Sequence, residues 1–338
     1  MNLSLSQIEE ITLGAVRVGK DENGMRFYRF TAQQEELYKV RNDDFYNKTF
    51  STTGIKFLFS TNSQKLFLNA NVIASSSSRT YFAFDVFVNG KKIDTLDNFS
   101  NVTLPKEYPT LRVPFGEFSK TFDLGSGDKE VCVYFPWSVI AAIKEFAVDD
   151  GAYVLPRKPS KKLLCFGDSI THGYDALYPC NKYITKLAES LDAEEFNKAI
   201  GGEIFFPSLA SAKENFEPDY ITVAYGTNDW GRCTKEVFTY NCKEFLKNLS
   251  NSYPNAKIFV ITPIWRKDLA ENKAFGDFKD TAEIIKTQAA AHKNVSVIYG
   301  FDFVPKDQNF FADFRLHPND DGFDCYFKNL SKQIKEIL

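Results

Sequence analysis

The first half of the chain consists of short alternating or aromatic-rich runs separated by turn residues. The clearest of these runs lie at residues 55–59, 65–72, 81–88 and 130–135. Alternation of apolar and polar side chains is typical of β-strands with one buried face. Asn89-Gly90 directly follows the third run and is typical of a tight hairpin turn. Because no long helical pattern interrupts the runs, we predict an antiparallel β-sandwich domain over residues 1–155.

The second half alternates apolar strands with helical stretches. The predicted strands are 163–166, 220–225, 258–261 and 295–298, and the predicted helices lie at roughly 179–191, 234–251, 277–292 and 320–337. This order predicts a parallel sheet with helices on both faces, over residues 160–338. The join is expected between Gly151 and Lys162, where Pro156 and Pro159 interrupt both patterns. Catalytic loops in such sheets follow the carboxyl ends of the strands.

Composition narrows the class of protein. The chain has 338 residues, of which 43% are hydrophobic and 25% charged, enough for a sizeable folded core. The net charge of −3 and the lack of a basic stripe make nucleic acid an unexpected partner. No run reaches the ~18 apolar residues of a membrane span, and the N-terminus does not resemble a signal peptide, so we expect a cytoplasmic protein without a membrane partner.

Cysteine and histidine usage argues against a metal site. The six cysteines are scattered and form no Cys-x-x-Cys pair, which favours reduced thiols. Only three histidines are present. We therefore expect no structural zinc site, and the serine chemistry considered below requires no metal or organic cofactor.

The segment 163–173, Leu-Leu-Cys-Phe-Gly-Asp-Ser-Ile-Thr-His-Gly, carries the strongest chemical indication. An apolar strand ends abruptly in a turn that would lift the Ser169 hydroxyl out of the sheet. A serine hydroxyl does not ionise near neutral pH. It becomes a nucleophile only where a base takes its proton and donors hold the oxyanion formed by its attack.

His317 is the candidate base. It lies in a polar loop just before the last predicted helix, and histidine titrates near the pH needed to accept and return a proton. His172 is the rival, three residues after Ser169, and we expect it at the rim of the cleft. His292 closes a predicted helix and is most simply explained as a partner of the helix dipole.

Candidate oxyanion donors follow two other predicted strands. The segment Asn197–Gly202 ends a short strand in paired glycines, which let a backbone amide approach a ligand closely. Asn228, in Gly226-Thr227-Asn228-Asp229, offers a side-chain amide, and Ser169 offers its backbone amide. A plain turn is the simpler interpretation of either segment taken alone.

The order of these segments resembles the four blocks of the SGNH (GDSL-type) hydrolase superfamily, over roughly residues 161–338. The blocks are Gly167-Asp168-Ser169, Asn197–Gly202, Gly226–Asp229 and a late Asp with His317-Pro318. The resemblance implies a three-layer α/β/α, flavodoxin-like domain. It also implies that Ser169 is both nucleophile and oxyanion donor, that Gly202 and Asn228 complete the oxyanion hole, and that His317 is the base.

The fourth block departs from the family pattern. The family usually places its aspartate three residues before the histidine, where this chain has Phe314, and Asp313 lies four residues before. Either the loop shifts so that Asp313 holds His317, or a backbone carbonyl orients the ring. We favour Asp313 as the third catalytic residue.

The N-terminal sandwich, jelly-roll-like in this comparison, resembles the corresponding part of the two-domain carbohydrate esterases of family 2. The resemblance implies a serine esterase that removes a short acyl group, preferably acetyl, from a small-molecule or oligosaccharide ester. Candidate substrate contacts are Asp168, Tyr178, Trp230 and Trp265. The simpler interpretation is that Asp168 hydrogen-bonds to neighbouring loops and that the aromatic residues pack in the ordinary way. The alternatives are an acyltransferase with the same site and a glycan-binding protein with a decayed site. The sequence leaves open whether the chain forms a homo-oligomer.

Overall fold

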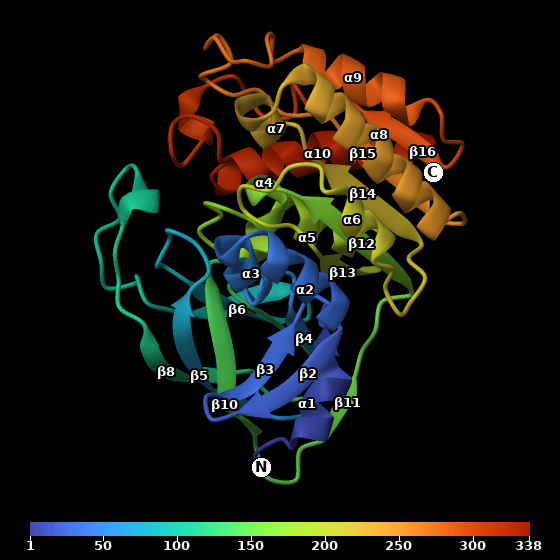
Figure 1. Cartoon of the computed structure of the whole chain (residues 1–338). Coiled ribbons are helices and arrows are strands. Elements are labelled where there is room, and N and C mark those ends of the chain that lie inside the picture. Colours follow the sequence, from blue (N-terminus) through green and yellow to red (C-terminus); the bar gives the residue numbers. More distant parts are fainter.

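The computed structural model describes residues 1–338 and divides their strands among three sheets (Figure 1). The first sheet contains β1 (Thr12–Leu13), β4 (Lys56–Thr61), β9 (Lys129–Tyr134), β6 (Ala83–Val88) and β7 (Lys91–Asp97) in that order, with β11 (Val154–Pro156) paired to β4. The second contains β2 (Arg17–Asp21), β3 (Gly24–Tyr28), β10 (Val139–Val148), β5 (Lys65–Ser75) and β8 (Gly116–Asp123). All pairs in both sheets are antiparallel, which confirms the predicted sandwich.

Alternation along the strands builds the sandwich core. In β5, Leu66, Leu68, Ala70 and Val72 are buried, whereas the residues between them are partly exposed. They pack in one cluster with apolar residues of the first sheet, such as Phe57. The hairpin predicted at Asn89-Gly90 joins β6 to β7, and both residues have the positive φ of a two-residue turn (49° and 75°).

The N-terminal half also holds helices that the pattern did not predict. They are α1 (Leu5–Ile11), α2 (Ala32–Arg41) and α3 (Asp43–Thr49). In α2 only Gln34 and Tyr38 are buried, so its apolar stripe is too thin to produce a helical pattern. The sequence did indicate where this helix begins, because Thr31 and Gln34 form a capping box.

The third sheet is wholly parallel and gives the predicted three-layer domain. Its order is β13 (Ala193–Asn197), β12 (Lys161–Gly167), β14 (Tyr220–Ala224), β15 (Lys257–Ile261) and β16 (Val295–Ile298). Its helices are α4 (Ser169–His172), α5 (Tyr183–Ser190), α6 (Pro207–Ser211), α7 (Thr227–Arg232), α8 (Lys235–Ser252), α9 (Asp280–Ala289) and α10 (Asp320–Ile337).

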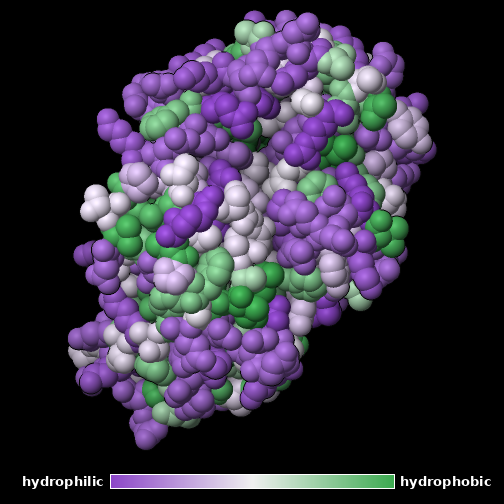
Figure 2. Space-filling view, turned by 60° about the vertical axis from the view of Figure 1, so that its left-hand side comes forward, coloured by the Kyte–Doolittle hydropathy of each residue, from purple (hydrophilic) through white to green (hydrophobic).

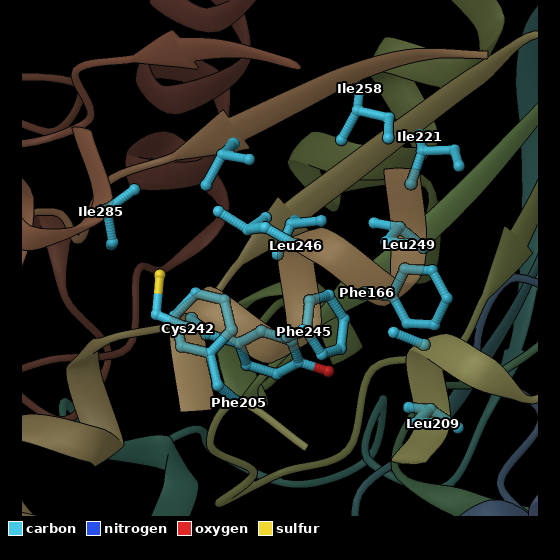
Figure 3. Close-up of a cluster of buried hydrophobic side chains, with 14 of the residues drawn as sticks. Phe166, Phe205, Leu209, Ile221, Cys242, Phe245, Leu246, Leu249, Ile258 and Ile285 are labelled. Carbon is cyan, nitrogen blue, oxygen red and sulfur yellow. The ribbon is translucent and has the colours of Figure 1, made fainter. Parts of the chain in front are cut away.

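Successive residues of the central strands enter different cores, because side chains alternate across a sheet. Leu164 and Phe166 of β12 pack with α6, α8 and α9, in the cluster drawn in Figure 3. Leu163 and Cys165 pack on the other face with α5 and α10. Burial on both faces explains why these strands are continuous apolar runs in the sequence.

The two halves of the chain share their cores. Phe30 and Tyr38 of the N-terminal half join the cluster around α8, and Tyr81 and Trp137 join the cluster around α5. The buried Arg29 guanidinium donates to the carbonyls of Ser51, Asn197 and Ala199, so one side chain ties residues of both halves together. The N-terminal half is therefore packed against the parallel sheet through both apolar and polar contacts.

None of the helices has the length and apolar character that a membrane span requires. The face of the molecule in Figure 2 is largely hydrophilic, with apolar side chains gathered in small patches.

Gly14 offers a test of this packing, with Gly151 as its matched control. Both have φ near +80°, which costs an L side chain about 1–2 kcal/mol. A Cβ at Gly14 would lie 2.2 Å from Gly54 O and 2.8 Å from Glu195 O, whereas a Cβ at Gly151 would meet nothing within 4 Å. We expect Gly14→Ala to lower the free energy of unfolding by roughly 1–3 kcal/mol more than Gly151→Ala does. Equal losses in urea denaturation would show that the two halves are not closely packed at this seam.

Candidate active site

Ser169 lies where β12 ends at the edge of the parallel sheet. The strand closes at Gly167, and Ser169 is the first residue of α4, which lifts its hydroxyl out of the sheet as the sequence predicted. The first N–H of a helix has no partner within that helix. Asp168 caps α4, because its Oδ1 accepts the N–H of Ile170.

The prediction that Asp168 contacts the substrate is wrong. Its side chain is buried and engaged in the helix cap, and it does not line the pocket that contains Ser169. Burial raises the pKa of Asp168 to about 6, although the backbone hydrogen bond opposes this shift. The residue is a structural part of the turn.

Three candidate catalytic residues form one hydrogen-bonded line. Ser169 Oγ lies 2.9 Å from His317 Nε2, and His317 Nδ1 lies 2.7 Å from Asp313 Oδ2. With the Nδ1 proton donated to the carboxylate, Nε2 is left as the acceptor that faces the hydroxyl. The carboxylate therefore fixes both the orientation and the tautomer of the ring.

The extra residue before His317 is accommodated by the backbone. Phe314 adopts a left-handed conformation (φ +52°), and the Oδ1 of Asp313 accepts the N–H groups of Arg315, Leu316 and His317. Burial alone would raise the pKa of Asp313, but the hydrogen bond to His317 and these backbone donors hold it well below its usual range. The sequence left open whether Asp313 or a backbone carbonyl orients the His317 ring, and in the structure it is Asp313 that contacts the ring.

A second carboxylate that the sequence analysis missed stands behind the histidine. Asp175 Oδ2 lies 3.5 Å from His317 Nδ1, and Arg79 of the N-terminal half binds both Asp175 oxygens at 2.7 Å. Tyr81 Oη also donates to Asp175 at 3.1 Å. Asp175, Asp313 and His317 offer three potential metal ligands within 4.8 Å of one another, but the bidentate guanidinium already satisfies Asp175.

The paired glycines expose a backbone N–H beside Ser169. A Cβ at Gly201 would lie 2.3 Å from Tyr174 Oη, and Gly202 has a φ of +89°, so both positions favour glycine. The N–H of Gly202 donates to no acceptor of the protein. Asn228 uses one amide proton on Glu203 O at 3.0 Å, and its second proton remains for a ligand.

Side chains anchor the carbonyls of this glycine loop. Lys48 Nζ donates to Gly201 O at 3.1 Å, and Arg232 Nη1 donates to Gly202 O at 2.6 Å. Asp229 links the loop to the next one, because its carboxylate accepts the N–H groups of Phe205 and Gly226. Burial raises the pKa of Asp229 to about 7.

A pocket of about 370 Å³ opens over Ser169. Only Tyr174 and Leu316 among its lining residues are hydrophobic, and the others are Asp44, Lys48, Ser77, Ser78, Ser169, Gly201, Gly202, Asn228, Arg232, Arg315 and His317. Four of them belong to the N-terminal half, which the sequence analysis did not connect with the site. Their polar and charged character was visible in the sequence, but nothing in its spacing indicated which loop they would reach.

The other sequence candidates lie away from the pocket. Trp230 is fully buried, with its Nε1 donating to Gly276 O, so it cannot stack on a substrate. Tyr178 packs against Phe99 and Lys92, and Trp265 packs against Phe311. Neither lines the pocket over Ser169.

His172 is not at the rim of a cleft, as we expected. It is fully buried, and its ring contacts the carbonyls of Trp137 and Ala199 and the hydroxyl of Ser51. Burial, with the nearby Arg29 charge, holds the pKa of His172 well below its usual value. A neutral imidazole there joins the two halves of the chain.

Comparisons with known proteins give one family match and several structures of similar fold. Residues 165–325 match the GDSL-like Lipase/Acylhydrolase family. No protein with a curated description matches the chain by sequence. Solved structures share the fold of both halves at low identity. The salicylyl-acyltransferase SsfX3 from a tetracycline biosynthetic pathway has a TM-score of 0.78 and 17% identity, covering 96% of this chain and 94% of its own.

Two further structures extend the likeness. A putative GDSL-like lipase from Bacteroides ovatus has a TM-score of 0.78 and 18% identity, covering 100% of this chain and 97% of its own. The acetyl xylan esterase Est2A from Butyrivibrio proteoclasticus has a TM-score of 0.64 and 17% identity, covering 100% of this chain and 98% of its own. Residues 165–325 of this chain thus match the GDSL-like lipase/acylhydrolase family, and this match together with the fold shared by both halves supports an ester-hydrolysing enzyme.

Proposed function

We propose that the protein is a serine esterase that removes a short acyl group, preferably acetyl, from a carbohydrate ester. The observation that carries the proposal is the hydrogen-bonded line from Ser169 through His317 to Asp313 beside the unpartnered N–H of Gly202. Nucleophile, base, orienting carboxylate and oxyanion donor are the parts that acyl transfer through a serine requires.

The reaction would run in two stages. His317 Nε2 takes the proton of Ser169 as its oxygen attacks the ester carbonyl, and the backbone N–H groups of Ser169 and Gly202 with the Asn228 amide stabilise the oxyanion. His317 then returns the proton to the departing alcohol, which leaves an acyl group on Ser169. A water molecule, deprotonated by the same ring, releases the acyl group as the acid. Each oxyanion donor would contribute a factor of roughly 10²–10³ to the rate.

The pocket supports a small acyl group on a polar alcohol. It has a volume of about 370 Å³, and hydroxyl, amide and charged groups form most of its lining. A long acyl chain would find few apolar side chains there, whereas the hydroxyl groups of a sugar would find many hydrogen-bonding partners. Several solved structures of similar fold are those of family 2 carbohydrate esterases.

A second candidate function is acyl transfer to an alcohol in place of water. It is favoured by the likeness to SsfX3, a salicylyl-acyltransferase, over nearly the whole chain. The acyl-enzyme would be the same, and product analysis with an added sugar acceptor separates the two functions. A glycan-binding protein with a decayed site is less well supported, because the contacts between Ser169, His317 and Asp313 are intact.

Replacing the serine tests the mechanism. Ser169→Ala is expected to lower kcat on p-nitrophenyl acetate by a factor on the order of 10⁴ or more, because no nucleophile would remain. Ser78→Ala is the matched control, since Ser78 lines the same pocket but does not contact His317. Turnover by Ser169→Ala equal to that of the wild type would rule the mechanism out.

Replacing the two carboxylates separates their roles. Asp313→Asn is expected to lower kcat by about 10⁴, the loss seen when a serine protease loses its orienting carboxylate. Asp175→Asn should lower kcat much less, because Asp175 lies 3.5 Å from His317 Nδ1 and is bound by Arg79. The measurement is kcat for both variants, with thermal unfolding to confirm that both are folded. A greater loss from Asp175→Asn would assign the orienting role to Asp175.

Acyl-chain length tests the proposed substrate class. We expect kcat/KM to fall from p-nitrophenyl acetate to butyrate to palmitate, because the lining of the pocket is mainly polar. The series is measured with the same detergent present for every ester, because the longest one is nearly insoluble in water. Fastest turnover of palmitate would contradict the preference for short acyl groups while leaving the serine mechanism standing.

A further inference from the structure

Arg232 is a cation of the pocket that no carboxylate neutralises. It ends α7, is exposed to solvent and lines the pocket over Ser169. Its one hydrogen bond to the protein is the bond from Nη1 to Gly202 O, and it forms no ion pair. A guanidinium has five N–H donors in a planar fork, so most of its donors remain available.

The other cations that line the pocket differ from Arg232 in this respect. Lys48 pairs with Asp44, and Arg315 Nη1 pairs with Asp268 Oδ2 at 2.8 Å. Asp44 is the one acidic residue in the lining, and it is already bound to Lys48. The pocket therefore has an excess of positive charge: Arg315 shares Asp268 with Arg266, and Arg232 has no carboxylate partner at all.

Arg232 also lies close to the reacting centre. A Cβ built on Gly202 would be 3.3 Å from Arg232 Nη2, so the free arm of the fork stands beside the residue whose N–H is the candidate oxyanion donor. If Arg232 served only to anchor the Gly202 carbonyl, a single donor would suffice. Its remaining donors, beside Gly202, fit a second group that binds in a bidentate manner.

We propose that Arg232 recognises an anionic group on the alcohol part of the ester. The inference rests on the proposed function, because an acetyl group is uncharged and leaves the alcohol as the part that can carry the charge. An acidic sugar has the required chemistry, either as the carboxylate of a uronic acid or as a sugar phosphate. Both offer a pair of anionic oxygens to the guanidinium fork, whereas a neutral sugar offers only uncharged hydroxyl groups, which form weaker hydrogen bonds.

The test compares three monoacetylated methyl glycosides that differ in charge. They are the glucoside, the glucuronide and the glucoside 6-phosphate, each assayed by acetate release. We expect kcat/KM to be about tenfold higher for one or both anionic esters, and the preferred arm identifies the anion. The preference should shrink in 0.5 M NaCl, because an exposed charge is screened.

Variants of Arg232 separate recognition from anchoring. Arg232→Gln removes the charged donor to the Gly202 carbonyl, so its activity on every ester is expected to fall. The informative readout is the ratio of anionic to neutral kcat/KM, which should approach one. Arg232→Lys should keep part of the preference. Arg112→Gln is the matched control, since Arg112 is another exposed arginine without an ion pair and does not line the pocket.

Two results would overturn the proposal. One is equal kcat/KM of the wild type for all three esters, and the other is a preference that Arg232→Gln leaves unchanged. Either result would leave the proposed function intact if Ser169→Ala still abolishes turnover of p-nitrophenyl acetate. If Ser169→Ala instead turns over p-nitrophenyl acetate as fast as the wild type, the proposed function itself is refuted.

Discussion

The active site depends on the hydrogen bonds that hold the backbone between Asn197 and Glu203. For the Gly202 N–H to face the pocket, the carbonyls of this loop must find donors elsewhere, because a buried carbonyl without a donor is costly. Arg29 donates hydrogen bonds to the carbonyls of Asn197 and Ala199. Lys48 and Arg232 donate to the carbonyls of Gly201 and Gly202. Burial lowers the pKa of Arg29 to about 9, so it remains charged near neutral pH. Hydrogen bonds from charged donors are worth about 1.5–3 kcal/mol each.

This arrangement makes the N-terminal half part of the chemistry. Arg29 and Lys48 come from that half and position the glycine loop proposed to bind the oxyanion, and Arg79 fixes the buried Asp175 behind His317. The same half supplies one wall of the pocket. Substrate binding would therefore involve both halves, although the residues proposed to bind the reacting atoms all lie in the GDSL-like domain.

The histidine loop shows how a departure from a family pattern can be accommodated. One extra residue separates the aspartate from the histidine, and the left-handed backbone at Phe314 absorbs it. Three backbone N–H groups then bind the Asp313 carboxylate and turn its other oxygen toward the ring. A left-handed conformation is uncommon for a phenylalanine and costs free energy, so it persists where the surrounding contacts require it. Sequence spacing alone could not distinguish this loop from one in which a carbonyl orients the ring.

The sequence by itself determined the sheets and the line of catalytic candidates. Strand alternation predicted the sandwich, apolar runs between helices predicted the parallel sheet, and both depend on local periodicity that the chain carries at every position. Ser169, Gly202, Asn228 and His317 could be chosen because each follows a strand or precedes a helix in a recognisable block. Trp230 and His172 were misplaced because burial is decided by neighbours distant in the sequence. Only the tertiary structure brought Arg29, Lys48, Arg79 and Asp175 to the site, since long-range contacts between polar side chains have no period from which they could be predicted.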